Sequence, residues 1–137
     1  MSSLKYSILI NADDFKALIV YLSLEANQLL YIGLRDTLMH QSCEKFIKDL
    51  NIPYFNMEDV RSIGIEGVME TALKTIMRFS PNCRIHLSFD IDGLDPKYAA
   101  GTGTPVPGGL SLEEGKYICK TLGQTGGLTV LAFVIMS

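Results

Sequence analysis

Two aspartates one residue apart are the strongest chemical feature of the sequence. Asp90 and Asp92 follow the alternating apolar run that begins at Arg84, within the stretch SFDIDGLDP. On a strand, residues i and i+2 point to the same face, and open α/β sheets bind ligands at the carboxyl ends of their strands. Neighbouring carboxylates repel each other, and a divalent cation that prefers oxygen ligands, such as Mg²⁺, Ca²⁺ or Mn²⁺, compensates both charges. The pair therefore indicates a cation site, with the capping of a turn before Pro96 as the alternative.

A glycine- and proline-rich loop follows the aspartates, over residues 93–109. Neither common type of phosphate-binding loop fits it. A G-x-G-x-x-G pattern starting at Gly101 would need glycine where Val106 stands. The Gly115-Lys116 pair is followed by Tyr117, where a Walker loop has Ser or Thr. The sequence therefore argues against a nucleotide site.

The other possible metal ligands and nucleophiles suggest no second site. His40 lies in a polar segment with no identifiable partner, and His86 lies on an expected strand, where a core role fits better than ligation. The cysteines, Cys43, Cys83 and Cys119, have neither zinc-knuckle nor C-x-x-C spacing. Cys119 is expected to be buried and unreactive on the apolar side of a helix.

Composition excludes several classes of partner. The 137-residue chain has a net charge of −3 and a pI near 5.3, without the clustered Lys and Arg that nucleic-acid or membrane surfaces need. Its longest apolar run, residues 17–24, is too short to span a bilayer. The three cysteines without a recognisable leader indicate reduced thiols. We expect a cytoplasmic protein with no nucleic-acid or membrane partner.

The elements that would position the aspartates alternate between strands and helices. Strands are expected at residues 29–34, from residue 54, at 84–90 and at 128–136. Amphipathic helices are expected around 43–50, at 66–78 and from 112 to about 123, the last opened by a capping box of Ser111 and Glu114. Such alternation predicts an α/β fold with a parallel sheet flanked by helices.

Two parts of this arrangement bear on the aspartates. Residues 29–34, 84–90 and 128–135 are expected to be adjacent parallel strands, with Asp90 and Asp92 at the carboxyl edge. Residues 1–28 stay uncertain, because 14–26 fit a helical period while 19–22 would equally suit a strand.

At this point a family resemblance becomes specific. The run HLSFDIDGLDPKYAAGTGTPVPGG, residues 86–109, resembles the ureohydrolase signature of the arginase family. The run YIGLRD, residues 31–36, resembles the arginase strand that precedes a substrate-binding loop. The similarity extends over roughly residues 24–131, and it implies an incomplete form of the family's three-layer α/β/α fold.

The resemblance also implies a reaction and a set of site residues. Arginases hydrolyse L-arginine to ornithine and urea with two bridged Mn²⁺ ions. By the family pattern Asp90 would bridge both metals, Asp92 would bind one, and Thr104 would line the substrate pocket.

The chain departs from the family at several functional positions. The upstream Gly-Asp-His and Asp-Ala-His-x-Asp motifs, which carry the other metal ligands, do not occur. Leu38 and Ile135 stand where the family has an aspartate near the substrate's α-amino group and a glutamate at the guanidinium. Ala100 replaces the usual proline before Gly101. No catalytic residue is therefore assigned.

These observations predict an arginase-family chain truncated at both ends, with residues 29–137 as a partial domain and 1–28 as an uncertain segment. We expect weak Mn²⁺ binding at most and no activity from the isolated chain. A non-catalytic fragment that associates with copies of itself or with full-length arginase chains is one alternative. A small metal-binding module that uses Asp90 and Asp92 without hydrolysis is another.

Overall fold

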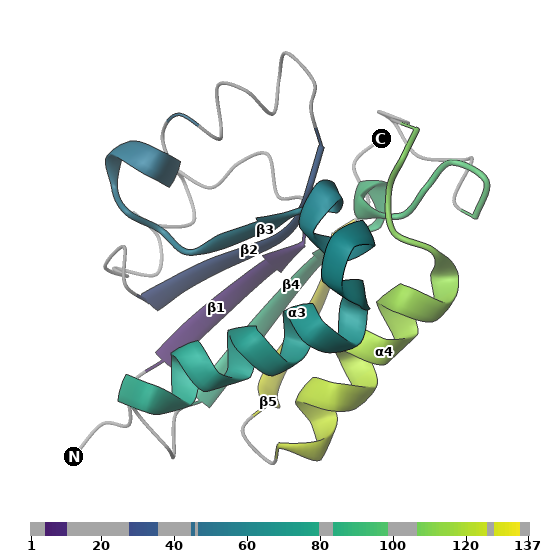
Figure 1. Ribbon diagram of the computed structural model, residues 1–137. Helices are drawn as coiled ribbons and strands as arrows, with labels where there is room; N and C mark the ends of the chain where they lie inside the picture. The colour runs from purple at the N-terminus through teal and green to yellow at the C-terminus, as the bar shows by residue number, and fades with distance from the viewer. Residues whose placement is uncertain are drawn as a thin grey trace.

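The computed structural model describes residues 5–10, 28–35, 45, 47–79, 84–98, 107–125 and 128–134. A five-stranded sheet in the order β3-β2-β1-β4-β5 forms its centre, and every neighbouring pair of strands is parallel (Figure 1). The strands are β1 (Lys5–Ile10), β2 (Leu29–Leu34), β3 (Tyr54–Asn56), β4 (Arg84–Asp90) and β5 (Leu128–Val134). The predicted α/β class with a parallel sheet is therefore confirmed.

The central strand β1 was not predicted from the sequence. It pairs with β2 on one side and with β4 on the other, so residues 29–34 and 84–90 are not neighbours and that prediction is wrong. The predicted adjacency of β4 and β5 is confirmed. β1 is held by pairing on both sides and by complete burial of Ile8 and Ile10. β1 lies within the segment whose structure the sequence left uncertain.

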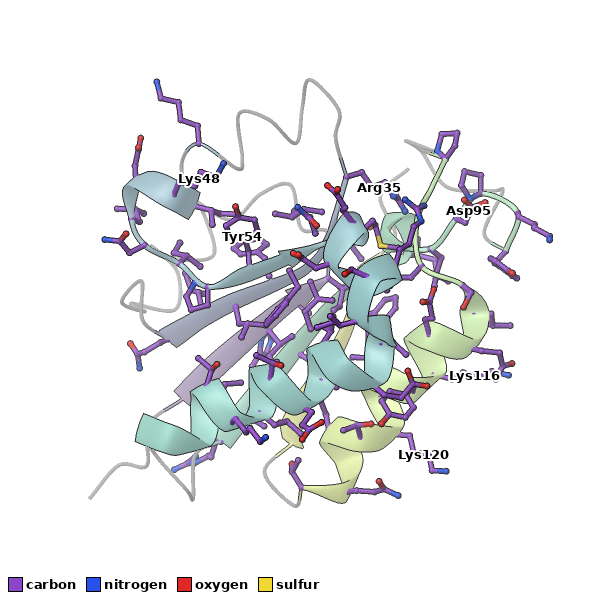
Figure 2. The ribbon with its side chains drawn as sticks, viewed as in Figure 1. Arg35, Lys48, Tyr54, Asp95, Lys116 and Lys120 are labelled. Atoms are coloured by element: carbon purple, nitrogen blue, oxygen red, sulfur yellow. The ribbon has the colours of Figure 1, made fainter. Side chains whose placement is uncertain are left out.

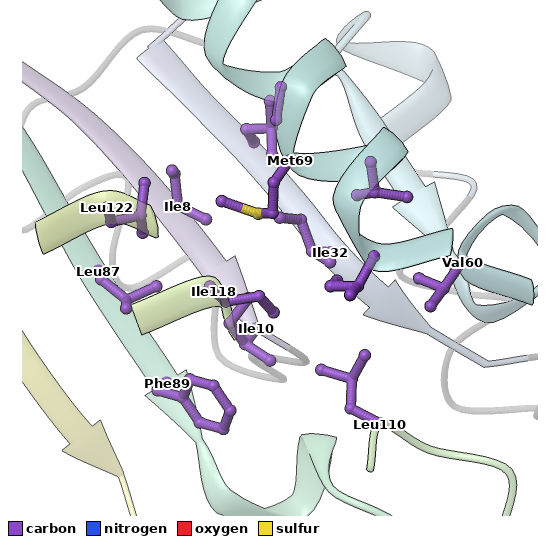
Figure 3. Close-up of a cluster of buried hydrophobic side chains, with 14 of the residues drawn as sticks. Ile8, Ile10, Ile32, Val60, Met69, Leu87, Phe89, Leu110, Ile118 and Leu122 are labelled. Atoms are coloured by element: carbon purple, nitrogen blue, oxygen red, sulfur yellow. The ribbon is translucent and has the colours of Figure 1, made fainter. Parts of the chain in front are cut away.

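One face of the sheet is covered by the helices α3 (Met57–Phe79) and α4 (Leu112–Gln124), which lie together across it in Figure 1. Alternate strand residues meet the apolar stripes of these helices in one cluster (Figure 3). Its labelled members are Ile8, Ile10, Ile32, Val60, Met69, Leu87, Phe89, Leu110, Ile118 and Leu122. Burial of these side chains supplies the main force that holds the helices on the sheet.

Helix α3 begins nine residues before the predicted start at residue 66. Its first turn is capped reciprocally, because the Asn56 side chain accepts from the Asp59 N–H and the Asp59 carboxylate accepts from the Asn56 N–H. Gly64, at φ 77° and ψ 160°, then interrupts the helical backbone. The apolar period restarts after this break, which is why the sequence pattern indicated a helix only over the second part.

Several local predictions are confirmed. Ser111 and Glu114 form the predicted capping box at the start of α4. Of the helix expected around residues 43–50, residues 45 and 47–49 are described and are helical. The helix ends before Asn51, whose φ of 56° suits a residue after a helix end. There the Ile52 N–H donates to the Ile47 carbonyl at 2.9 Å. No helix in the described ranges is long and apolar enough to cross a membrane.

Candidate functional site

The candidate site lies at the carboxyl edge of the sheet, where β4 ends. Asp90 is the last residue of β4 and is 2% exposed. Asp92 lies within the short 3₁₀ turn Ile91–Gly93. The predicted position of Asp90 at the strand end is confirmed, but the argument that both aspartates alternate on one strand is wrong, because the chain leaves the strand between them.

The segment after this turn folds back on the residues that precede α4. The Leu110 N–H donates to the Gly93 carbonyl at 2.9 Å, and the Asp95 N–H donates to the Leu110 carbonyl at 2.8 Å. These bonds form a parallel bridge between Leu94 and Leu110. The two ends of the glycine- and proline-rich loop are thereby held together.

The side chain of Asp95 strengthens this junction, in which residues 93–95 are hydrogen-bonded to residues 108–110. One carboxylate oxygen accepts from the Lys97 N–H at 3.0 Å, and the other accepts from the Gly108 N–H at 2.8 Å. These backbone donors, Lys97 first, hold the pKa of Asp95 below its usual value, and the Arg35 guanidinium adds a smaller effect in the same direction. Asp95 thus takes the turn-capping role that the sequence offered as an alternative for its neighbours Asp90 and Asp92.

Arg35 is the site residue that sequence reasoning missed. It follows β2 directly, is 6% exposed, and donates from Nη2 to the Gly93 carbonyl at 2.8 Å and the Leu94 carbonyl at 3.1 Å. Figure 2 shows Arg35 and Asp95 near each other at this end of the sheet. The YIGLRD run contains Arg35, but the hydrogen-bond partners of Arg35 lie 58 and 59 residues away, so no local pattern identifies them.

A second arginine contacts the same junction from its exposed side. Arg61, on the part of α3 before the break at Gly64, donates from Nη2 to the Gly108 carbonyl at 2.9 Å. Gly108 has a φ of 86°, a conformation that favours glycine. Arg35 therefore contacts the junction through buried hydrogen bonds to Gly93 and Leu94, whereas Arg61 contacts Gly108 only at the exposed surface.

The donor chemistry at the end of β4 suits a hard divalent cation, but the described residues do not complete a metal site. Asp90 offers carboxylate oxygens, which Mn²⁺ accepts readily, and a buried carboxylate needs hydrogen bonds or a positive charge. Within the described ranges, no three His, Cys, Asp or Glu side chains meet as a possible metal site. Thr104 and His40 lie outside these ranges. The assignment of metal to Asp90 and Asp92 stays a prediction.

The remaining titratable candidates lie away from this edge. His86 is half-buried near the middle of β4, and burial lowers its pKa below 6.5. Cys119 is half-buried on α4, and burial raises the pKa of its thiol, which keeps the thiol protonated and unreactive. Cys119 is therefore more accessible than the full burial expected from the sequence, and the non-ligand roles of both residues stay predictions.

Comparisons with known proteins agree on one family. The profile described as the arginase family matches residues 7–136, which includes most of β1. An arginase of Coccidioides immitis is 44% identical over 107 residues, which cover 78% of this chain and 32% of the relative. Arginase-2, mitochondrial, of Rattus norvegicus is 48% identical over 109 residues, which cover 77% of this chain and 29% of that protein. The chain thus spans about a third of the length of these curated relatives.

Solved structures show the same relationship in three dimensions. The crystal structure of Entamoeba histolytica arginase in complex with L-ornithine superposes with a TM-score of 0.81 at 27% identity. The superposition covers 98% of this chain and 54% of the other. The predicted arginase-like arrangement of sheet and helices, incomplete relative to the whole fold, is therefore confirmed.

Proposed function

Because the chain belongs to the arginase family, we propose that it carries part of a binuclear manganese centre that hydrolyses L-arginine to ornithine and urea. The observation that carries the proposal is the buried carboxylate of Asp90, at the strand end where parallel sheets bind ligands. The L-ornithine bound to the Entamoeba arginase supports the same class of product.

Each site residue has a proposed role. Asp90 would bridge the two Mn²⁺ ions, Asp92 would bind one of them, and Thr104 would line the pocket for L-arginine. Bound Mn²⁺ supplies a Lewis acid that lowers the pKa of a coordinated water. The chain's own described contribution is the strand end that presents Asp90 and the hydrogen-bonded junction of residues 93–95 with 108–110, which fixes the turn containing Asp92.

The isolated chain is proposed to form no urea. Apolar side chains at Leu38 and Ile135 stand where the family places carboxylates that contact the substrate. A buried guanidinium without a carboxylate partner costs several kcal/mol in order of magnitude. A partly occupied metal site would also leave the attacking water poorly held.

These two apolar positions favour one alternative, a non-catalytic arginase-family chain. Such a chain would act by association with copies of itself or with full-length arginase chains. A cytoplasmic location and a place in arginine metabolism and the urea cycle are proposed with either function.

The experiment is a Mn²⁺ titration by electron paramagnetic resonance and calorimetry. Wild type is expected to bind Mn²⁺ weakly, and the double variant Asp90→Asn/Asp92→Asn is expected to lose that binding. Asp49→Asn, which alters an exposed aspartate on the helical residues 47–49, is the matched control and should bind like wild type. Mn²⁺ binding that is unchanged in the double variant would overturn the assignment.

A urea assay with Mn²⁺ and L-arginine tests the second half of the proposal. No urea above the buffer rate is expected from the isolated chain. Sustained turnover that disappears in Asp92→Ala would contradict the proposed inactivity and would show that the remaining ligands come from residues not assigned above.

A further inference from the structure

The side chain of Arg35 joins parts of the fold that the sheet itself keeps apart. Arg35 follows β2, whereas Gly93 and Leu94 follow β4, and β1 lies between these two strands. A single nitrogen, Nη2, donates to both carbonyls. Hydrogen bonds from a charged donor are about twice as strong as neutral ones, and these two are buried.

The absence of a side chain at Gly109 leaves the space that the Arg35 guanidinium occupies. A Cβ atom at Gly109 would overlap Arg35 Nη2 and would lie 2.6 Å from Cζ and 2.7 Å from the Gly93 oxygen. Glycine at this position therefore lets the backbone of residues 108–110 lie directly against the charged group. The negative charge of Asp95 is close enough to interact with Arg35.

The acceptor Gly93 connects this contact to the rest of the junction. Its carbonyl accepts from Arg35 and also from the Leu110 N–H. Two residues on, the Asp95 N–H donates to the Leu110 carbonyl, and the Asp95 carboxylate accepts from the Gly108 N–H. Displacing the guanidinium would therefore loosen both ends of the loop between residues 95 and 108.

We propose that Arg35 is a positioning residue: it fixes the turn that carries Asp92 and holds residues 93–95 against residues 108–110. Its effect on metal binding rests on the proposed function of Asp90 and Asp92. Its effect on the junction does not, because the hydrogen bonds that define the junction involve no metal.

The variant Arg35→Met removes the donors and keeps a long side chain. The matched control is Arg61→Met, which removes an arginine that also donates from Nη2 to a carbonyl of this junction, but at the exposed surface. Amide hydrogen exchange of Asp95 and Leu110 is measured in each protein, together with thermal unfolding and Mn²⁺ affinity. Comparison with distant amides, such as that of Ile118 in α4, separates a local opening from a global loss of stability.

In Arg35→Met the amide hydrogens of Asp95 and Leu110 are expected to exchange at least about tenfold faster than in wild type. This is the effect expected from the loss of one charge-assisted hydrogen bond. Mn²⁺ affinity is expected to fall about 10–100-fold, as when groups that orient metal ligands are removed. Arg61→Met should change both quantities by less than about threefold, because its hydrogen bond is exposed to water.

Three results would overturn the inference or separate it from the proposed function. Unchanged exchange in a folded Arg35→Met chain would show that Arg35 does not hold the junction. Faster exchange with unchanged Mn²⁺ affinity would show that the junction does not position the metal-binding carboxylates. No Mn²⁺ binding by wild type would refute the proposed metal site, and the exchange result would still decide the role of Arg35.

Arg35→Lys decides the matter if Arg35→Met does not fold. Lysine keeps the positive charge, but its side chain ends one bond short of Nη2 and lacks the planar donor group. Exchange of the two amides should again be faster than in wild type. A folded Arg35→Lys chain with wild-type exchange would contradict the inference.

Discussion

Replacement of Gly109 by alanine tests how tightly the junction is built. The added methyl group would overlap Nη2 of Arg35 and approach Cζ at 2.6 Å and the Gly93 oxygen at 2.7 Å, and real Cβ atoms essentially never make contacts under 3.0 Å. Either the guanidinium leaves its two carbonyl acceptors or the backbone of residues 93 and 109 separates. The first response breaks two buried hydrogen bonds, and the second stretches the bond from the Leu110 N–H to the Gly93 carbonyl.

The magnitude follows from those bonds. Two hydrogen bonds from a charged donor contribute about 1.5–3 kcal/mol each, so their loss costs roughly 3–6 kcal/mol. The reduced freedom of alanine in the unfolded chain offsets about 0.4–1 kcal/mol. The expected net loss of about 2–5.6 kcal/mol is a large part of the 5–15 kcal/mol that is usual for a domain.

Urea denaturation measures this loss, with the m value as the check that the compactness of both states is unchanged. Gly123→Ala is the control, because a Cβ there meets nothing within 4 Å, and the exposed helical position should gain about 0.5–1 kcal/mol. In an Arg35→Met background Gly109→Ala should cost less, with a coupling free energy of about 0.5–3 kcal/mol. A Gly109→Ala chain as stable as wild type, or equal costs in both backgrounds, would refute the reasoning.

The other predictions concern parts of the fold away from Arg35. Gly64→Ala forces a φ of 77° on a residue with a side chain and should lower the free energy of unfolding by about 1–3 kcal/mol in urea denaturation. Ser111→Ala removes the acceptor for the Glu114 N–H at 3.1 Å and should cost about 1 kcal/mol in the same assay. Burial lowers the pKa of His86, so the unfolded chain binds its proton more readily, and stability should fall as the pH drops below 6.5. Thermal unfolding between pH 5 and 8 checks this: His86→Gln should flatten the fall, with His40→Gln measured for comparison.

Elements with strong local signals were predictable from the sequence. The bounds of β4 agree with the prediction because apolar residues alternate up to Asp90. Helix α4 begins where the capping box of Ser111 and Glu114 indicated. In both, the signal and the structure it specifies lie within one turn or one strand, so no distant partner is needed to recognise them.

Elements that depend on distant partners were not predictable in the same way. β1 is recognisable as a strand chiefly through its pairing with β2 and β4. The first part of α3 was missed because Gly64 shifts the helical period and because Asn56 and Asp59 cap it in place of the more usual Ser and Glu. These features depend on tertiary pairing or on a single backbone conformation.

In the candidate site, too, one position follows from the local sequence pattern and another does not. The position of Asp90 at a strand end follows from alternation and chain order, and it was predicted. The relation of Asp92 to Asp90 was not, because a 3₁₀ turn begins directly after the strand and cancels the two-residue repeat. Strand periodicity therefore predicts that Asp90 lies at the end of the strand, but it does not predict where Asp92 lies.

The order of the strands explains why a long side chain connects the end of β2 with the turn of Asp92. β1 lies between β2 and β4, so the two strand ends are not neighbours. The ends of β2 and β4 lie two strand spacings apart, roughly 9.5 Å, which no direct backbone hydrogen bond can bridge. The turn after β4 is hydrogen-bonded to Leu110 through the Gly93 carbonyl. The long side chain of Arg35 reaches the same carbonyl with its planar group of donors. Gly109 leaves the space that this group needs. A well-formed site therefore requires the end of β2 and the glycine before Leu110 as well as the aspartate run, because the run alone does not determine where its turn is held.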